Sequence, residues 1–171
     1  MKMKDEGNSP SMGAKLLTPE LTEQILETQR ECTMIWNTRD GNSAGTMVSF
    51  VWHRGSVWIG GPSDLPRMAA IRRNPNMCIV VSVLGTGLGR DRCISLRGEC
   101  TVHDDPAVHA EMAPRLMRKL GTFNLDRRTA QMVAAPGLVW LEIKPERLFT
   151  SDWNDLMMQS LGLESPEPAV M

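Results

Sequence analysis

The pattern of apolar and polar residues along the chain predicts six β-strands. Residues 93–102 show it most clearly, because Ile94 and Leu96 fall on one face and mainly polar side chains fall on the other. Residues 77–84 are almost entirely apolar, which predicts a central strand buried on both faces. Gly98 lies inside a predicted strand and indicates a bulge or a close backbone contact. The predicted strands are residues 33–38, 46–53, 56–60, 77–84, 93–102 and 138–144.

Apolar residues at helical spacing predict helices over residues 18–29 and 105–120, and we also expect a short basic helix over residues 65–73 and a last short helix over residues 151–161. The turn Arg54-Gly55 is short enough to join the second and third strands as an antiparallel hairpin. Helices fall between the third and fourth strands and between the fifth and sixth, so the order is not a β-α-β alternation. This order predicts a mainly β fold, an antiparallel barrel with peripheral helices.

Length and composition fit one globular domain. The chain has 171 residues, of which 42% are hydrophobic and 23% are charged. We expect this domain over residues 16–155, a flexible segment over residues 1–15, and a short helix with a disordered tail over residues 156–171. The net charge of −1 gives no overall field that favours nucleic acid or an anionic membrane.

Targeting and metal-binding patterns are absent from the sequence. No stretch reaches the roughly 20 apolar residues of a membrane span, and the first residues have no apolar signal segment, so we expect a cytoplasmic protein. The four cysteines form no CxxC pair and no Cys/His metal spacing, so we expect no metal site. The three histidines, His53, His103 and His109, form no nucleophile–base pair by spacing.

Residues 56–78 contain a candidate phosphate site. Gly60 and Gly61 predict a turn that lets the backbone approach a ligand, and Ser63 or Asp64 can cap the helix that follows. Arg67 lies in the first turn of that helix, where free N–H groups also favour an anion. The alternative is an ordinary strand–turn–helix connection with a solvated basic face, which this stretch alone favours.

Three segments together resemble a known family. They are PRMAAIRRNPNMCIVVSV (residues 66–83), ISLRGECTVHDD (94–105) and WLEIKPERLFTSDW (140–153). In this order and at this spacing they resemble the pyridoxamine 5′-phosphate oxidase-like flavin-binding split-barrel proteins, and the resemblance covers residues 17 to 153. It implies a six-stranded antiparallel split barrel that forms a homodimer, with flavin in two clefts across the dimer interface.

The resemblance also implies roles for individual residues. Arg67 matches the family's phosphate-binding Lys or Arg. Gly60 and Gly61 match a turn where many members have a Thr or Ser that donates to the phosphate, and Ser63 is close enough to replace that hydroxyl. The segment Met47, Val48, Ser49 matches the strand that runs along the flavin ring, and Arg92 and Cys93 match a ring contact. Separately, among five tryptophans, Trp52 and Trp153 are the candidates to lie near a ring-shaped ligand.

The resemblance implies an FMN-dependent oxidoreductase that moves hydride between a nicotinamide or small organic substrate and the flavin. The lack of a catalytic acid–base set is compatible with this, because the cofactor carries the electrons. Two alternatives stay open. One is a deazaflavin-dependent reductase with a basic groove supplied by Arg72, Arg73 or Arg90; the other is a protein that binds flavin or haem without turnover. The substrate-binding residues of true pyridoxamine phosphate oxidases are not recognisable here.

Overall fold

A computed structural model of the chain describes residues 16–121, 133, 135 and 137–153, which form three helices and seven strands. The helices are α1 (Pro19–Thr28), α2 (Pro66–Arg73) and α3 (Pro106–Leu120). The strands are β1 (Glu31–Asn37), β2 (Ser43–Ser49), β3 (Val51–His53), β4 (Ser56–Pro62), β5 (Asn76–Ser82), β6 (Arg92–His103) and β7 (Leu138–Asp152).

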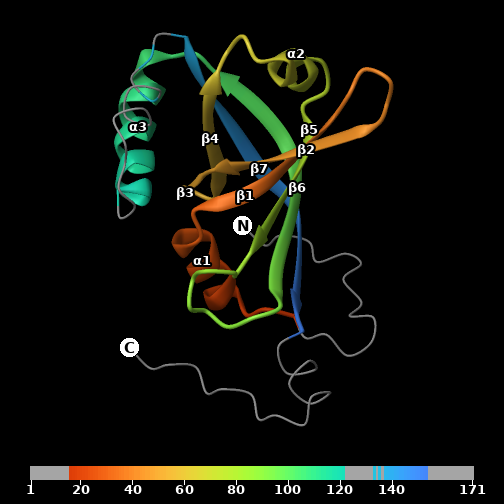
Figure 1. The fold of residues 1–171 in the computed structure, drawn as a ribbon, viewed down its shortest axis with the longest axis vertical. Coiled ribbons are helices and arrows are strands. Elements are labelled where there is room, and N and C mark those ends of the chain that lie inside the picture. The colour runs from red at the N-terminus through yellow and green to blue at the C-terminus, as the bar shows by residue number, and fades with distance from the viewer. Residues whose placement is uncertain (1–15, 122–132, 134, 136, 154–171) are drawn as a thin grey trace.

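All seven strands form one antiparallel sheet in the order β2-β1-β5-β6-β7-β4-β3. The sheet curls into a half-barrel, and α1 and α2 pack against its inner side (Figure 1). The main core fills this inner side and includes Ile25, Met34, Ile71 and Ile79. A second core lies beneath α3 on the opposite face of β4 and β7. The predicted mainly β, antiparallel barrel class is therefore confirmed.

The sheet has one strand more than predicted, because the predicted strand 46–53 is interrupted at Phe50. Its first part belongs to β2, which pairs with β1, and its second part is β3, which pairs with β4. Phe50 is fully buried, and its N–H donates to the carbonyl oxygen of Arg30 at 3.1 Å. The apolar pattern continues through this corner, so the sequence alone gives no sign of the break. The predicted hairpin at Arg54-Gly55 is confirmed, with both residues at positive φ.

The last strand is longer than predicted, because Pro145 does not end it. The register between β6 and β7 shifts at Arg97/Gly98, and this irregularity places Pro145 opposite Gly98. A Cβ at Gly98 would collide with the carbonyl oxygen of Lys144, so the predicted close backbone contact is confirmed. Residues 151–152 therefore belong to β7 and not to the predicted helix 151–161, of which residues 154–161 lie outside the described residues.

Strand β5 is central, as predicted, because it pairs with both β1 and β6. The expectation that it is buried on both faces was wrong. Met77, Ile79 and Val81 are buried against the core, whereas Cys78 and Val80 on the outer face are only half-buried. The apolar run of β5 therefore includes side chains on the outer face of the sheet that are partly exposed in a single subunit.

The helices begin at proline residues, as their sequences predict. Thr18 caps α1 by accepting from the N–H of Leu21 at 3.2 Å. The predicted cap of α2 was wrong: its N-cap is Leu65, which makes no side-chain capping bond. No helix in the described part of the chain is both long and apolar enough to span a bilayer.

Candidate phosphate and flavin site

Gly60 and Gly61 lie within β4 and not in a turn after it, which corrects the prediction. They pair with Trp140 and Val139 of β7, and the ladder continues to Pro62. The connection to α2 therefore begins at Ser63. The two glycines act as strand residues that present bare backbone on both faces of the sheet.

The two faces of this bare backbone have different neighbours. A Cβ at Gly60 would lie 3.3 Å from the six-membered ring of Trp140 on the α3 side. A Cβ at Gly61 would lie 3.1 Å from Cε of Met68 and 3.7 Å from Nη2 of Arg67 on the α2 side. The guanidinium of Arg67 thus lies directly against the main chain of β4.

Arg67 has a buried polar atom without a partner. Its Nε makes no hydrogen bond to any described residue. Nε of Arg115 shares this property, but the Arg115 guanidinium also lies 3.6 Å from Glu111 through Nη2. An unsatisfied buried donor is costly, and an anion bound at Arg67 would remove that cost. The bare strand at Gly61 lets the guanidinium lie close to the main chain of β4, so these residues fit a phosphate group.

Ser63 lies in the connection that leads from β4 to α2. Its N–H donates to the carbonyl oxygen of Gly137 at 2.9 Å, and its Oγ lies 3.7 Å from where a Cβ of Gly137 would stand. Ser63 is half-buried and stands four residues before Arg67 in the chain. It therefore belongs to the same part of the molecule as the guanidinium.

The predicted ring segment forms the end of the edge strand β2. Met47 faces outward and is 59% exposed, whereas Val48 packs against the main core. Ser49 pairs with Glu31, which lies next to the segment in β1. The register runs from Met47 to Thr33 of β1, then to Val80 of β5 and Ser95 of β6, so this segment lies level with the part of β6 that follows Cys93.

Arg92 lies at the other end of the sheet, and its guanidinium is already engaged. Its Nε donates to Oδ2 of Asp152 at 2.8 Å, and its Nη1 donates to the carbonyl oxygen of Leu88 at 2.6 Å. These bonds tie the loop between β5 and β6 to the end of β7. They give Arg92 a structural role that sequence reasoning did not identify.

Cys93 and Trp153 accompany Arg92 at this end. The Cys93 thiol lies 3.1 Å from the hydroxyl of Ser151, and the backbone N–H of Trp153 donates to the carbonyl oxygen of Asp91 at 3.0 Å. Trp52, the other tryptophan predicted near a ligand ring, instead donates its indole N–H to Glu23 of α1 at 2.6 Å. The structure thus groups Trp153, but not Trp52, with other predicted residues.

The predicted site residues therefore fall into two distant groups. Trp140 pairs with both Gly60 and His103, so His103 marks the Arg67 end of β6. Arg92 is at the other end of this 12-residue strand, roughly 36 Å away along the chain. Figure 1 shows α2 and the loop between β5 and β6 near opposite ends of the sheet. We therefore expect one flavin mononucleotide to be too short to contact both groups in a single subunit.

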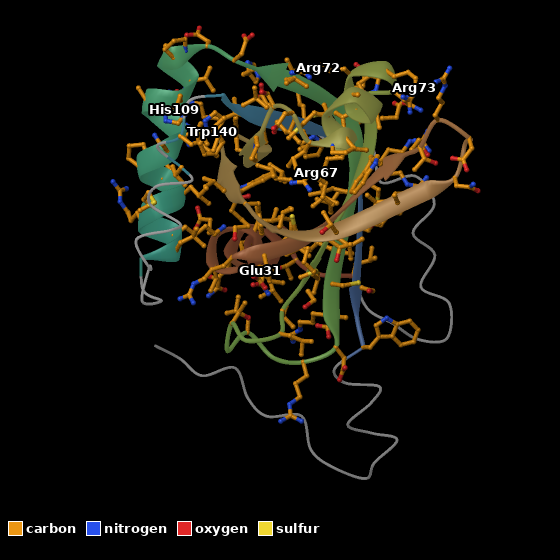
Figure 2. The ribbon with its side chains drawn as sticks, turned by 45° about the horizontal axis from the view of Figure 1, so that its top comes forward. Glu31, Arg67, Arg72, Arg73, His109 and Trp140 are labelled. Atoms are coloured by element: carbon orange, nitrogen blue, oxygen red, sulfur yellow. The ribbon has the colours of Figure 1, made fainter. Side chains whose placement is uncertain are left out.

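The basic residues predicted for a deazaflavin groove are not gathered around Arg67. Arg72 and Arg73 are exposed in the last turn of α2, and Figure 2 shows them on the outer side of the helix while Arg67 extends toward the strands. Arg90 lies in the loop between β5 and β6, at the end of the sheet that contains Arg92. Within the described part of the chain, Arg72, Arg73 and Arg90 thus do not lie around the Arg67 guanidinium.

Sequence reasoning missed a set of hydrogen-bonded side chains around α3. All three histidines take part: His53 pairs with Glu111 at 3.0 Å, His103 with Glu142 at 3.0 Å, and His109 with Trp140 at 3.3 Å. The bond from His53 holds the pKa of Glu111 below its usual value. The partners are 31 to 58 positions apart, and no spacing rule links such pairs. Among the described residues, no group of three or more His, Cys, Asp or Glu side chains can hold a metal ion.

Comparison with known proteins identifies the fold. No protein-family model and no curated protein matches this sequence. Among solved structures, a conserved hypothetical protein of Mycobacterium tuberculosis is similar, with a TM-score of 0.70, 16% identity, and coverage of 98% of this chain and 97% of that chain. A putative pyridoxamine 5′-phosphate oxidase of Listeria innocua has a TM-score of 0.59 and 15% identity over 77% of this chain and 95% of that chain.

An F420 reductase is also similar, with a TM-score of 0.58 and 16% identity over 74% of this chain and 94% of that chain. At these identities the likenesses concern the fold alone. They agree with the curled antiparallel sheet and its peripheral helices. The chain therefore has the flavin-binding split-barrel fold of the pyridoxamine 5′-phosphate oxidase-like proteins.

Proposed function

We propose that this protein is a flavin-dependent oxidoreductase whose cofactor is FMN, with the phosphate group bound at Arg67. The observation that carries the proposal is the buried Nε of Arg67, which has no hydrogen-bond partner among the described residues, beside the bare backbone of Gly61. The similarity in fold to an F420 reductase and to a putative pyridoxamine 5′-phosphate oxidase supports the same class of chemistry.

In this proposal the chain's residues bind and orient the cofactor. Arg67 holds the phosphate through charge-assisted hydrogen bonds, and Gly61 lets the main chain approach it. The hydroxyl of Ser63 is a further donor. When bound, FMN supplies hydride transfer at its ring to or from a nicotinamide or a small organic substrate. The edge strand β2 at Met47, Val48 and Ser49 positions that ring.

The proposal includes a homodimer, because the two groups of site residues are too far apart to serve one flavin in a single subunit. Arg92, Cys93 and Trp153 of one subunit would then face the flavin held by Arg67 of the other. The partly exposed outer face of β5 and the exposed Met47 offer apolar surface for such an interface.

Replacing Arg67 tests the proposal. We expect Arg67→Ala to weaken FMN binding roughly 10- to 150-fold, because hydrogen bonds to charged groups contribute about 1.5–3 kcal/mol. Flavin fluorescence titration measures this affinity. Arg72→Ala, in the same helix but on its outer side, is the matched control and should leave binding unchanged. Equal FMN affinity in Arg67→Ala and wild type would overturn the proposed phosphate site.

A deazaflavin-dependent reductase is the second candidate, because a neighbour in fold is an F420 reductase. Side-by-side titration with FMN and a deazaflavin decides between the two candidates. Much tighter binding of the deazaflavin would favour the deazaflavin-dependent reductase over the FMN-dependent one. Turnover distinguishes both from a protein that only binds the cofactor. Bound flavin that a nicotinamide cannot reduce, and that no acceptor reoxidises, would favour a binding function.

A further inference from the structure

Trp140 connects α3 to the strand that carries the proposed phosphate site. It is 1% exposed and packs in the second core with Trp58 of β4 and with Met112 and Leu116 of α3. Its indole Nε1–H donates to Nδ1 of His109 at 3.3 Å, and the ring centroids lie 6.2 Å apart. The opposite edge of the indole lies against Gly60.

The indole and the Arg67 guanidinium lie on opposite faces of the same bare strand. Gly60 faces Trp140, and the next residue, Gly61, faces Arg67. Neither glycine has a side chain to fill a gap, so a shift of the indole acts directly on the main chain of β4. Figure 2 shows His109 and Trp140 on one side and Arg67 beneath α2 on the other. Only the width of β4 separates the two contacts.

His109 determines where the indole can sit. A buried indole N–H needs an acceptor, and Nδ1 of His109 provides it. This bond requires Nδ1 of His109 to carry no proton. Without the acceptor, the indole must move to find another partner or leave its N–H unsatisfied. A movement of the indole alters its contact with Gly60.

We propose that His109 is a positioning residue of the phosphate site, acting through Trp140 and the Gly60-Gly61 backbone on the position of Arg67. This inference rests on the proposed binding of phosphate by Arg67. His109 lies in α3 and does not touch the phosphate site. The inference nevertheless places it among the residues that determine the affinity for the phosphate end of the cofactor.

The test compares FMN with riboflavin, which lacks the phosphate, in fluorescence titrations of the full chain. We expect His109→Phe to weaken FMN binding roughly fivefold, the effect of one net hydrogen bond, and to leave riboflavin binding unchanged. His109→Asn should retain wild-type affinity, because its side-chain oxygen can accept in place of Nδ1. In an Arg67→Ala background, His109→Phe should have no further effect on FMN.

The possible outcomes distinguish a failure of the His109 inference from a failure of the proposed phosphate site at Arg67. If Arg67→Ala does not lower the FMN-to-riboflavin preference, the phosphate site itself fails, and the inference fails with it. If Arg67→Ala lowers the preference but His109→Phe does not, only the inference fails. Equal losses for FMN and riboflavin in His109→Phe would indicate a general structural role and overturn the inference. Should His109→Phe not fold, Trp140→Phe removes the same bond from the other side and must lower the same preference.

Discussion

An added methyl group would contact a rigid neighbour at Gly60 and a flexible one at Gly61. At Gly60 it would press on the buried ring of Trp140, whereas at Gly61 it would meet the flexible end of Met68 and then Arg67. We expect Gly60→Ala to lower the free energy of unfolding by about 1–3 kcal/mol, as overpacking of a core does. Gly61→Ala should cost less stability, because only the flexible end of Met68 must move, and it should reduce FMN affinity because the added methyl group would touch Nη2 of Arg67.

Urea unfolding and FMN titration of both variants check this prediction. Gly41→Ala is a useful control, because a methyl group added at Gly41 would have no atom within 4 Å, while the backbone there has a φ of +82°. It should lose stability through backbone strain alone and keep its FMN affinity. A Gly61→Ala variant with normal FMN affinity would show that the guanidinium does not need its contact with the strand.

The identity of Arg67 as a candidate could be predicted from its place in a first helical turn after a glycine pair. The lack of a partner for its Nε could not be predicted from the sequence, because it depends on how β4 and α2 pack together. The bond between His109 and Trp140 was also beyond sequence reasoning. It joins a helix and a strand whose contact is set by the tertiary fold.

At the level of the helices and strands, Lys119 links the end of α3 to the end of α1 by a hydrogen bond. Its Nζ donates to the carbonyl oxygen of Leu26 at 3.0 Å and lies 4.0 Å from the centre of the Phe50 ring. Burial lowers the pKa of Lys119 to about 8 from 10.5, and burial raises the pKa of both Cys32 and Cys100 to about 12 from 9.0. These opposed shifts predict a characteristic dependence of stability on alkaline pH.

Between pH 8 and 9 the unfolded chain holds the Lys119 proton and the folded chain loses it, so the free energy of unfolding should rise. Above pH 9 the unfolded thiols lose protons that the folded ones keep, so stability should then fall. Urea unfolding from pH 7.5 to 10.5 measures both parts. Lys119→Met should abolish the rise and keep the fall; a rise that persists in this variant would contradict the assignment.

The elements themselves were largely predictable, and the exceptions have physical causes. The hairpin at Arg54-Gly55 follows from its turn residues. The break at Phe50 does not, because an apolar residue at a barrel corner continues the apolar pattern of its strand. Pro145 is typical of the end of a strand, but the register shift opposite Gly98 accommodates it within β7.

At the level of the whole molecule, the resemblance assigned nine residues to one cofactor, and Trp153 was added separately, but the sequence could not assign these residues to one subunit. The structure separates them along β6, and this separation leads to a test by subunit complementation. Arg67→Ala damages one group and Trp153→Ala the other. In a mixed dimer with shared sites, one site combines both wild-type groups and the other combines both defects.

Mixing the two variants after reversible unfolding should therefore restore tight FMN binding at about a quarter of all sites, because random pairing makes about half of the dimers mixed. Each variant refolded alone is the control. Sedimentation should show a dimer in all samples. A dimeric mixture without restored sites would contradict the shared arrangement and would require both groups to act within one subunit or separately.

The central claim is that Arg67 and the adjacent bare strand hold the phosphate of FMN. The most direct measurement is the ratio of riboflavin to FMN dissociation constants for the wild-type protein, from parallel fluorescence titrations at one salt concentration. We expect FMN to bind at least about tenfold more tightly than riboflavin, since a charge-assisted contact at the half-buried Arg67 guanidinium depends on the phosphate. Equal affinities for riboflavin and FMN would contradict it.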